Sequence, residues 1–127
     1  MQKRLKHICD LYYGKNLPEK EFQKGEYPVC GANGIIGFHN TYTHKEAMLL
    51  VSCRGENSGV IHVSPPYSYI TNNSIICEFK TTDIDNTFLY FFLKAQRREK
   101  LTSGSAQPQI TTFDLGRFKV PEFPPKP

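Results

Sequence analysis

Cysteine and histidine are the side chains of this chain that could hold a metal ion or act as a nucleophile with its base. The cysteines are spaced more than twenty residues apart, at Cys9, Cys30, Cys53 and Cys77. Zinc sites usually contain short Cys-x-x-Cys spacings. A site here would need Cys30 and Cys53 to converge with His39 and His44. Because each cysteine lies among apolar or strand-forming residues, the sequence predicts four buried free thiols and no metal site.

The tetrapeptide Ser64-Pro65-Pro66-Tyr67 resembles the SPPY or NPPY motif of amino-methyltransferases. In that motif the polar side chain and a proline carbonyl hold the target amino group, and the aromatic ring stacks on the flipped base. Such an enzyme also needs a glycine-rich turn that leads into a helix and binds S-adenosylmethionine, and the glycine sets at 31–34 and 55–59 lack that helix. We therefore interpret 64–67 as a diproline turn between two strands. With no nucleophile elbow and no carboxylate placed to orient a histidine base, the sequence predicts no catalytic set.

Polar, glycine-bearing stretches offer a different chemistry. Their Asn, Gln, Ser, Thr and Arg side chains donate to and accept from base edges and phosphate oxygens, and glycine lets the backbone approach a ligand closely. The same composition is also ordinary turn chemistry, so composition alone leaves a binding surface and plain connections both open. The stretches are 31–45, 52–59, 70–74 and 102–111.

Strands must position these stretches. Short runs rich in Val, Ile, Tyr and Phe, punctuated by Gly, Asn and Pro, predict a twisted, mostly antiparallel sheet built largely from residues 28–79. A short helix is expected before the sheet, because Leu5, Ile8, Cys9 and Tyr12 fall at helical spacing ahead of Gly14.

One long helix is predicted over residues 86–101, capped by Asp83 or Asp85. Its basic side, which includes Lys94, Arg97 and Arg98, is expected to face outward. The residues expected to pack on the sheet are Phe88, Leu89, Phe92 and Leu93. After this helix, Thr111 or Thr112 is expected to cap a short helical turn, and the FKVP run to form a last edge strand.

Length and composition place these elements in one domain of mixed α/β (α+β) class. The chain has 127 residues, 39% hydrophobic and 13% aromatic, which is typical of a folded protein with a single core. No apolar run approaches the roughly 20 residues of a membrane helix, so we expect a cytoplasmic protein and no membrane partner. The net charge of +4 allows a polyanionic partner without requiring one.

Several blocks together carry a family resemblance. GEYPVCGANGIIGFHNTYTH is followed by LLVSCRGENSGVIHVSPPYSYITNNSI, by FLYFFL, and finally by GSAQPQIT and FKVPEFPP. In this order and spacing they resemble the target-recognition domain of the specificity subunit of type I restriction-modification systems, from about Leu5 to Pro125. GANGIIG and GSAQPQIT together carry most of the likeness.

The resemblance implies a mixed α/β domain with a twisted sheet, similar to the small DNA-reading domain of certain adenine methyltransferases. Specificity subunits carry two such domains, each reading one half of a split sequence in double-stranded DNA, joined by long helices. The resemblance further implies that methylation, ATP hydrolysis and cleavage belong to partner methyltransferase and restriction subunits. S-adenosylmethionine, ATP and magnesium would be bound there, and no cofactor in this chain.

On this reading the polar stretches are the DNA surface. We expect Lys45, Arg54 and Arg98 to contact phosphates, because their charge attracts the backbone of any sequence. Short amides and hydroxyls on glycine-flanked loops can enter a groove and read base edges, and the candidates are Asn57, Ser58, Asn72 and Asn73. In GSAQPQIT, Gln107 and Gln109 can satisfy backbone groups at the hand-over to the helical spacer or reach phosphates.

The expected division of the chain is a recognition domain over residues 1–121 and the start of a proline-rich linker at 122–127, leading to an absent helical spacer. Two alternatives stay open: a fragment of an adenine-specific DNA methyltransferase, and a protein-interaction module that does not bind DNA. The first predicts S-adenosylmethionine binding, and the second predicts no salt-dependent affinity for DNA.

Overall fold

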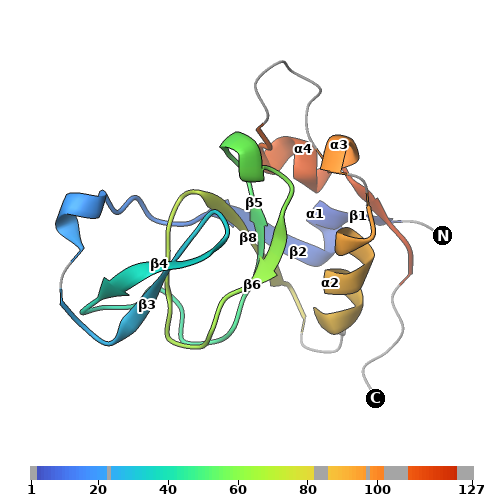
Figure 1. The fold of residues 1–127 in the computed structure, drawn as a ribbon. Coiled ribbons are helices and arrows are strands. Elements are labelled where there is room, and N and C mark those ends of the chain that lie inside the picture. The colour runs from blue at the N-terminus through green and yellow to red at the C-terminus, as the bar shows by residue number, and fades with distance from the viewer. Residues whose placement is uncertain (1–2, 23, 82–85, 97, 102–108, 123–127) are drawn as a thin grey trace.

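A four-stranded antiparallel sheet forms the centre of the molecule (Figure 1). The computed structural model describes residues 3–22, 24–81, 86–96, 98–101 and 109–122, without the side chains of residues 98 and 99. The strand order is β2-β8-β5-β6. The strands are β2 (Cys9–Tyr13), β5 (Leu49–Ser52), β6 (Ile61–Val63) and β8 (Ser74–Phe79).

A second, three-stranded sheet has the order β4-β3-β7. β3 (Tyr27–Gly31) and β4 (Gly34–His39) form a hairpin with a register shift at Val29/Cys30, and β7 (Tyr69–Ile70) pairs with β3 in parallel. The predicted single sheet over 28–79 is therefore divided in two. The central sheet also contains a strand that precedes residue 28, because β2 pairs with β8 along its whole length.

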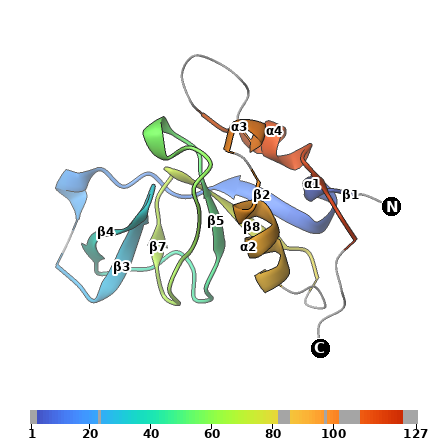
Figure 2. The same cartoon turned by 45° about the vertical axis from the view of Figure 1, so that its right-hand side comes forward.

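The central sheet is buried on both faces, which explains its continuous apolar runs. Ile75 and Cys77 of β8 belong to a core shared with Leu89 and Leu93, whereas Ile76 between them points into a second, smaller core. That smaller core contains Cys30, Leu50, Ile70 and Ile76. Helices cover one face and the three-stranded sheet covers the other (Figure 2).

The N-terminal helix is shorter than predicted. α1 (Leu5–Ile8) is one turn, and Cys9 and Tyr12 lie in β2 instead of on a helical face. Before α1, β1 (Lys3–Arg4) pairs with β9 (Lys119–Val120), so the FKVP run does form an edge strand. The end of α1 and the β1–β9 pair both depend on pairing between strands that are distant in the sequence, and local residue spacing does not reveal such pairing.

The predicted helix over 86–101 is in fact two helices, α2 (Asn86–Lys94) and α3 (Arg98–Leu101). Leu89 and Leu93 are fully buried, and Phe92 packs half-buried on the same core, as predicted. Phe88 is half-buried as well. Of the outward basic residues, Lys94 is exposed, while Asp83, Asp85 and Arg97 and the side chain of Arg98 lie outside the described residues.

α4 (Thr112–Gly116) confirms the predicted cap, since the Asp114 N–H donates to Thr111 Oγ1 at 3.0 Å. Two single 3₁₀ turns, η1 (Glu19–Glu21) and η2 (Gly55–Asn57), complete the described elements. The longest described helix has nine residues, and within the described residues no helix meets the requirements of a membrane span.

Candidate nucleic-acid interface

Three of the polar stretches meet where β5 ends and β8 begins. The Cys53 N–H donates to the Asn73 carbonyl at 3.0 Å, and the Ile110 N–H donates to the Cys53 carbonyl at 3.0 Å. Arg54 and Gln109 form an isolated antiparallel bridge. We call this surface the loop end: the turn at 32–33, the segment 53–60, the turn at 72–73, and Gln109. Its 3₁₀ turn η2, drawn in green, lies at the upper margin of the molecule in Figure 1.

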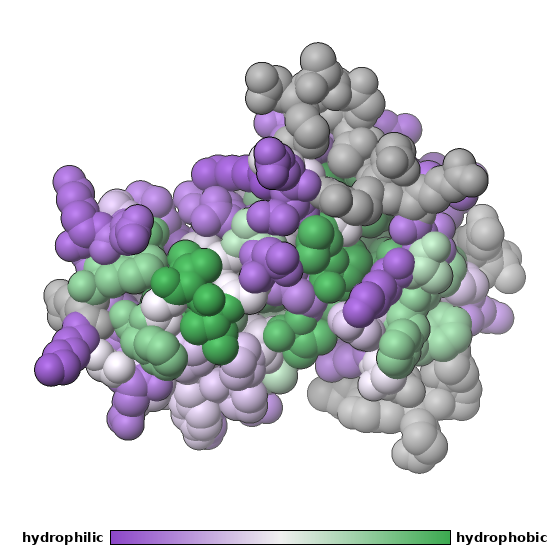
Figure 3. Space-filling model, in the orientation of Figure 1, coloured by the Kyte–Doolittle hydropathy of each residue, from purple (hydrophilic) through white to green (hydrophobic). Residues whose placement is uncertain are grey.

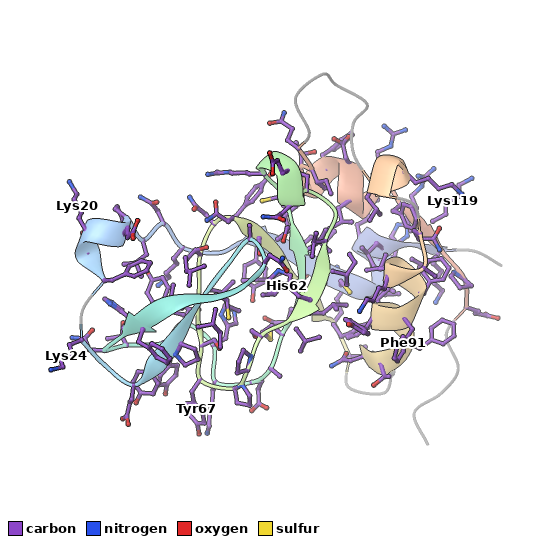
Figure 4. The ribbon with its side chains drawn as sticks, viewed as in Figure 1. Lys20, Lys24, His62, Tyr67, Phe91 and Lys119 are labelled. Atoms are coloured by element: carbon purple, nitrogen blue, oxygen red, sulfur yellow. The ribbon has the colours of Figure 1, made fainter. Side chains whose placement is uncertain are left out.

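The hairpin turn is tied to the end of β5 and the start of β8 by a cluster around His62 (labelled in Figure 4). The His62 Nε2 lies 3.2 Å from Ser52 Oγ and 3.3 Å from Ser74 Oγ. The Ser52 hydroxyl donates to the Ala32 carbonyl, and the Ser74 hydroxyl donates to the Gly31 carbonyl at 3.2 Å. We call this arrangement of Ser52, His62 and Ser74 the His62 clamp.

The clamp fixes the tautomer of His62. Each serine has one hydroxyl proton and gives it to a backbone carbonyl, so the His62 Nε2 must carry the hydrogen and act as donor to the serine oxygens. A histidine that donates to a serine cannot take the proton of that serine, so the cluster is not a nucleophile with its base. Burial lowers the pKa of His62, which keeps the ring neutral at pH 7. The clamp is therefore structural, and the sequence pattern gave no signal for it.

The loop end presents both charge and amides to solvent. Arg54 and Gln109 are exposed, and Asn57, Asn72 and Asn73 are half-exposed. The turn at 72–73 is held by Thr71, whose hydroxyl donates to the Cys30 carbonyl at 3.0 Å and accepts from the Asn73 N–H at 3.4 Å. Five of the predicted site residues are thus brought together on one surface.

Other predicted residues lie elsewhere. Ser58 is only 1% exposed, so its hydroxyl is not offered to a groove in this conformation. Lys45 lies before β5 and Arg54 after it, about 13 Å apart or more at roughly 3.3 Å per strand residue. Because they lie at opposite ends of the strand, Lys45 does not join Arg54 in one patch. Gln107 and the side chain of Arg98 lie outside the described residues.

Two features beside the loop end escaped the sequence patterns. Lys15 is exposed, and its backbone pairs with Thr71 and donates to the Ile70 carbonyl at 2.9 Å, which places the backbone of this residue next to the turn at 72–73. Ile35 and Ile36, directly after the hairpin turn, are 53% and 51% exposed and contribute apolar surface over the edge strand β4 (Figure 3). Apolar side chains at a groove contact thymine methyl groups.

The Ser64–Tyr67 stretch is a turn between β6 and β7, as interpreted from sequence. Ser64 is 2% exposed and its Oγ accepts from the Met48 N–H at 2.9 Å, so it does not face a substrate. The Tyr67 backbone has φ +57° and its N–H donates to the Lys45 carbonyl at 3.1 Å. The geometry gives no support to a methyltransferase motif.

The cysteines are all buried and free, as predicted. Burial raises the pKa of Cys9 to about 12 and holds the pKa of Cys77 well above its usual range. His44 contacts Tyr12, with its Nε2 2.9 Å from the phenol oxygen, and the phenol donates to Glu78. Within the described residues, no three His, Cys, Asp or Glu side chains are grouped to hold a metal ion.

Comparisons with known proteins agree with one another. The family model described as the type I restriction modification DNA specificity domain matches residues 1–127. The Mycoplasma pneumoniae protein S.MpnORF507P, provisionally described as a type I specificity subunit, is 26% identical over 129 residues that cover 94% of this chain and 35% of that protein.

Solved structures show the same fold. The S subunit of a type I restriction-modification system from M. genitalium superposes with a TM-score of 0.81 at 19% identity, covering 97% of this chain and 34% of that one. The HsdS subunit from Thermoanaerobacter tengcongensis gives 0.71 at 20% identity, covering 98% and 33%. The chain thus spans about a third of the length of the relatives it matches.

Proposed function

The chain belongs to the type I restriction-modification DNA specificity domain family, and from that premise we propose that its loop end reads one half of a split DNA sequence. It is a target-recognition domain and is not itself an enzyme. Its relatives are about three times as long. We therefore propose as partners the second recognition domain, the helical spacer, and the methyltransferase and restriction subunits. S-adenosylmethionine, ATP and magnesium are proposed to bind to those subunits, and the complex to work in the cytoplasm, where bacterial DNA lies.

The main support for this proposal is that three amides and a cation lie together at the loop end. Asn57, Asn72 and Asn73 lie on tight turns joined by backbone hydrogen bonds, so the backbone positions that carry their amides are held relative to one another. An amide both donates and accepts, which suits the N6 and N7 edge of adenine and discriminates it from other bases. Arg54 is exposed beside these amides and supplies charge for a neighbouring phosphate.

Removing a phosphate contact and removing a base contact should change the affinity for DNA in different ways. Arg54→Ala should weaken binding to every duplex and lower the slope of log affinity against log salt by about 0.9. Asn72→Ala should leave that slope unchanged and cost roughly 1 to 3 kcal/mol on the cognate half-site alone. Lys20→Ala, a change of an exposed cation on η1 far from the loop end, is the matched control.

The measurement is a titration of cognate and scrambled duplexes at two or more salt concentrations with the purified chain and with the complete specificity subunit. The cognate sequence comes from mapping methylated sites in a strain that carries the complete system. If Arg54→Ala and Asn72→Ala both bind as the unchanged protein does, the loop end is not the DNA surface. S-adenosylmethionine binding by the chain alone, measured by calorimetry, would favour the methyltransferase alternative instead.

A further inference from the structure

Four basic side chains gather around a hollow of about 310 Å³ on the side of the molecule away from the hairpin. They come from distant parts of the chain: Arg4 of β1, Lys100 of α3, Arg117 after α4, and Lys119 of β9. The fold brings them together through the β1–β9 pairing, in which Arg4 lies opposite Lys119. We call these four residues the β1–β9 patch.

The two arginines of the patch are held in place. The Arg4 Nη1 donates to the Arg117 carbonyl at 2.8 Å, which ties β1 to the end of α4. The Arg117 guanidinium lies 5.5 Å from the centre of the Phe113 ring. An ordered guanidinium loses less freedom when it binds an anion, and its planar fork matches the oxygens of a phosphate.

Among the described residues that line the hollow, four are basic and one, Asp114, is acidic. The ion pair between Lys80 and Asp10, at 3.6 Å, lies elsewhere. Lys100, Arg117 and Lys119 are exposed to solvent. Like charges held together by the fold repel one another and favour a partner that brings negative charge.

The position of the patch points to DNA as that partner. Gln109 of the loop end is followed by Ile110, Thr111 and then α4, so the loop end and the patch adjoin along the chain. Figures 1 and 2 both show η2 and α4 along the upper part of the molecule and the β1–β9 pair beyond α4, at the right-hand side. A duplex that lies along these elements passes over the loop end first and the patch next.

We propose that the β1–β9 patch is a second, sequence-independent anchor that binds the phosphate backbone of DNA beside the half-site read by the loop end. This inference rests on the proposed function. The patch adds affinity for any sequence, while the amides of the loop end choose among sequences. It also fixes the direction in which the duplex crosses the domain.

The test uses a triple variant, Lys100→Ala with Arg117→Ala and Lys119→Ala, in the complete specificity subunit. Arg4 stays unchanged because its hydrogen bond supports the fold. The control is the double variant Lys20→Ala with Lys24→Ala, which removes exposed charge at the opposite side of the molecule (Figure 4). Thermal melting of each variant shows whether the fold is kept.

Binding is measured to two duplexes, one that ends at the half-site and one that continues for about a helical turn of roughly 10 base pairs beyond it. On the long duplex the triple variant should lower the salt slope by up to about 0.9 for each phosphate that it no longer neutralises, equally for cognate and scrambled sequence. On the short duplex it should bind as the unchanged protein does. The control should match the unchanged protein on both.

The outcomes separate the two proposals. If Arg54→Ala weakens binding and the folded triple variant does not, the patch is not a DNA anchor although the loop end is. If the triple variant binds both duplexes normally and no longer assembles with the methyltransferase subunits, the patch docks an acidic protein surface and this inference is wrong. If the unchanged subunit shows no salt-dependent DNA binding, the proposed function itself fails.

Discussion

Replacing His62 by alanine should loosen β6 from the ends of β5 and β8 while leaving both cores intact. The change removes the Nε2–H that both clamp serines share, at 3.2 and 3.3 Å. The two serine hydroxyls keep their backbone carbonyls as partners. The perturbation is therefore confined to the tie between β6 and the ends of β5 and β8.

The magnitude follows from those contacts. An intramolecular hydrogen bond contributes about 0.5 to 1.5 kcal/mol, and two long bonds that share one N–H fall toward the lower end, so the free energy of unfolding should drop by about 1 to 2 kcal/mol. For a chain of this length that lowers the melting temperature by about 3 to 8 °C. His62→Gln, which keeps an amide N–H donor, should recover part of the loss. His7→Ala, a change of an exposed histidine on α1, should leave the melting temperature unchanged.

The pH dependence gives an independent measurement. Burial lowers the pKa of His62 from its usual value of 6.5, so below that pH the unfolded chain takes up a proton that folded His62 does not. Stability is therefore full above about pH 6.5 and falls as the pH drops toward the lowered pKa. Burial lowers the pKa of His44 also, despite the nearby Glu78, so that residue acts with the same sign. His62→Ala should make the decline shallower without abolishing it.

The assay is thermal and urea unfolding between about pH 7.5 and 5.5, with amide hydrogen exchange read at Ser52, Ile61 and Val63. Exchange at these amides should rise in His62→Ala more than exchange in β2. If melting and exchange match the unchanged protein at both ends of this pH range, the ring does not hold β6 to the ends of β5 and β8. The assignment of Nε2 as donor would then be wrong as well.

Four substitutions and one labelling experiment test the packing. Gly14→Ala should destabilise by about 1 to 3 kcal/mol or more, because its Cβ would lie 2.2 Å from the Thr71 carbonyl oxygen. Gly34→Ala, where φ is +98° and the space is open, should cost only about 1 to 2 kcal/mol of backbone strain in the same urea titrations. Leu89→Ala should cost about 2 to 5 kcal/mol, since Leu89 is fully buried, whereas Phe91→Ala at 62% exposure should cost little; equal losses would contradict the helix orientation. The four thiols should react with a maleimide only after unfolding, since burial raises the pKa of each; rapid labelling of native protein, counted by mass spectrometry, would contradict their burial.

Local structure could be predicted from the sequence where short-range residue patterns determine it. Thr111 as a cap, the turn at Ser64–Tyr67 and the buried faces of Leu89 and Leu93 depend on short-range patterns, and they were predicted correctly. The division of the strands into two sheets could not be predicted. Ile75, Ile76 and Cys77 are all buried, so their apolar run does not say which neighbours lie on either face.

The candidate site was predictable in composition but not in arrangement. Asn57, Asn72 and Arg54 were chosen by residue type, and the fold does bring them together. Lys45 fits the same pattern, yet it precedes β5 whereas Arg54 follows it. His62 gave no signal because its partners, Ser52 and Ser74, lie ten and twelve residues away on other strands. Only strand pairing makes them neighbours.

The burial of the central sheet on both faces also has a consequence for how the recognised DNA sequence could change. β5 and β8 are stabilised by two cores, and their side chains do not depend on the loops that leave them. Surface changes away from core, caps and strained turns usually shift stability by less than about 0.5 kcal/mol. Half-exposed Asn57, Asn72 and Asn73 can therefore be exchanged at little cost to folding. If the loop end reads DNA as proposed, a few substitutions there would change the target sequence while the interior that every variant needs stays the same.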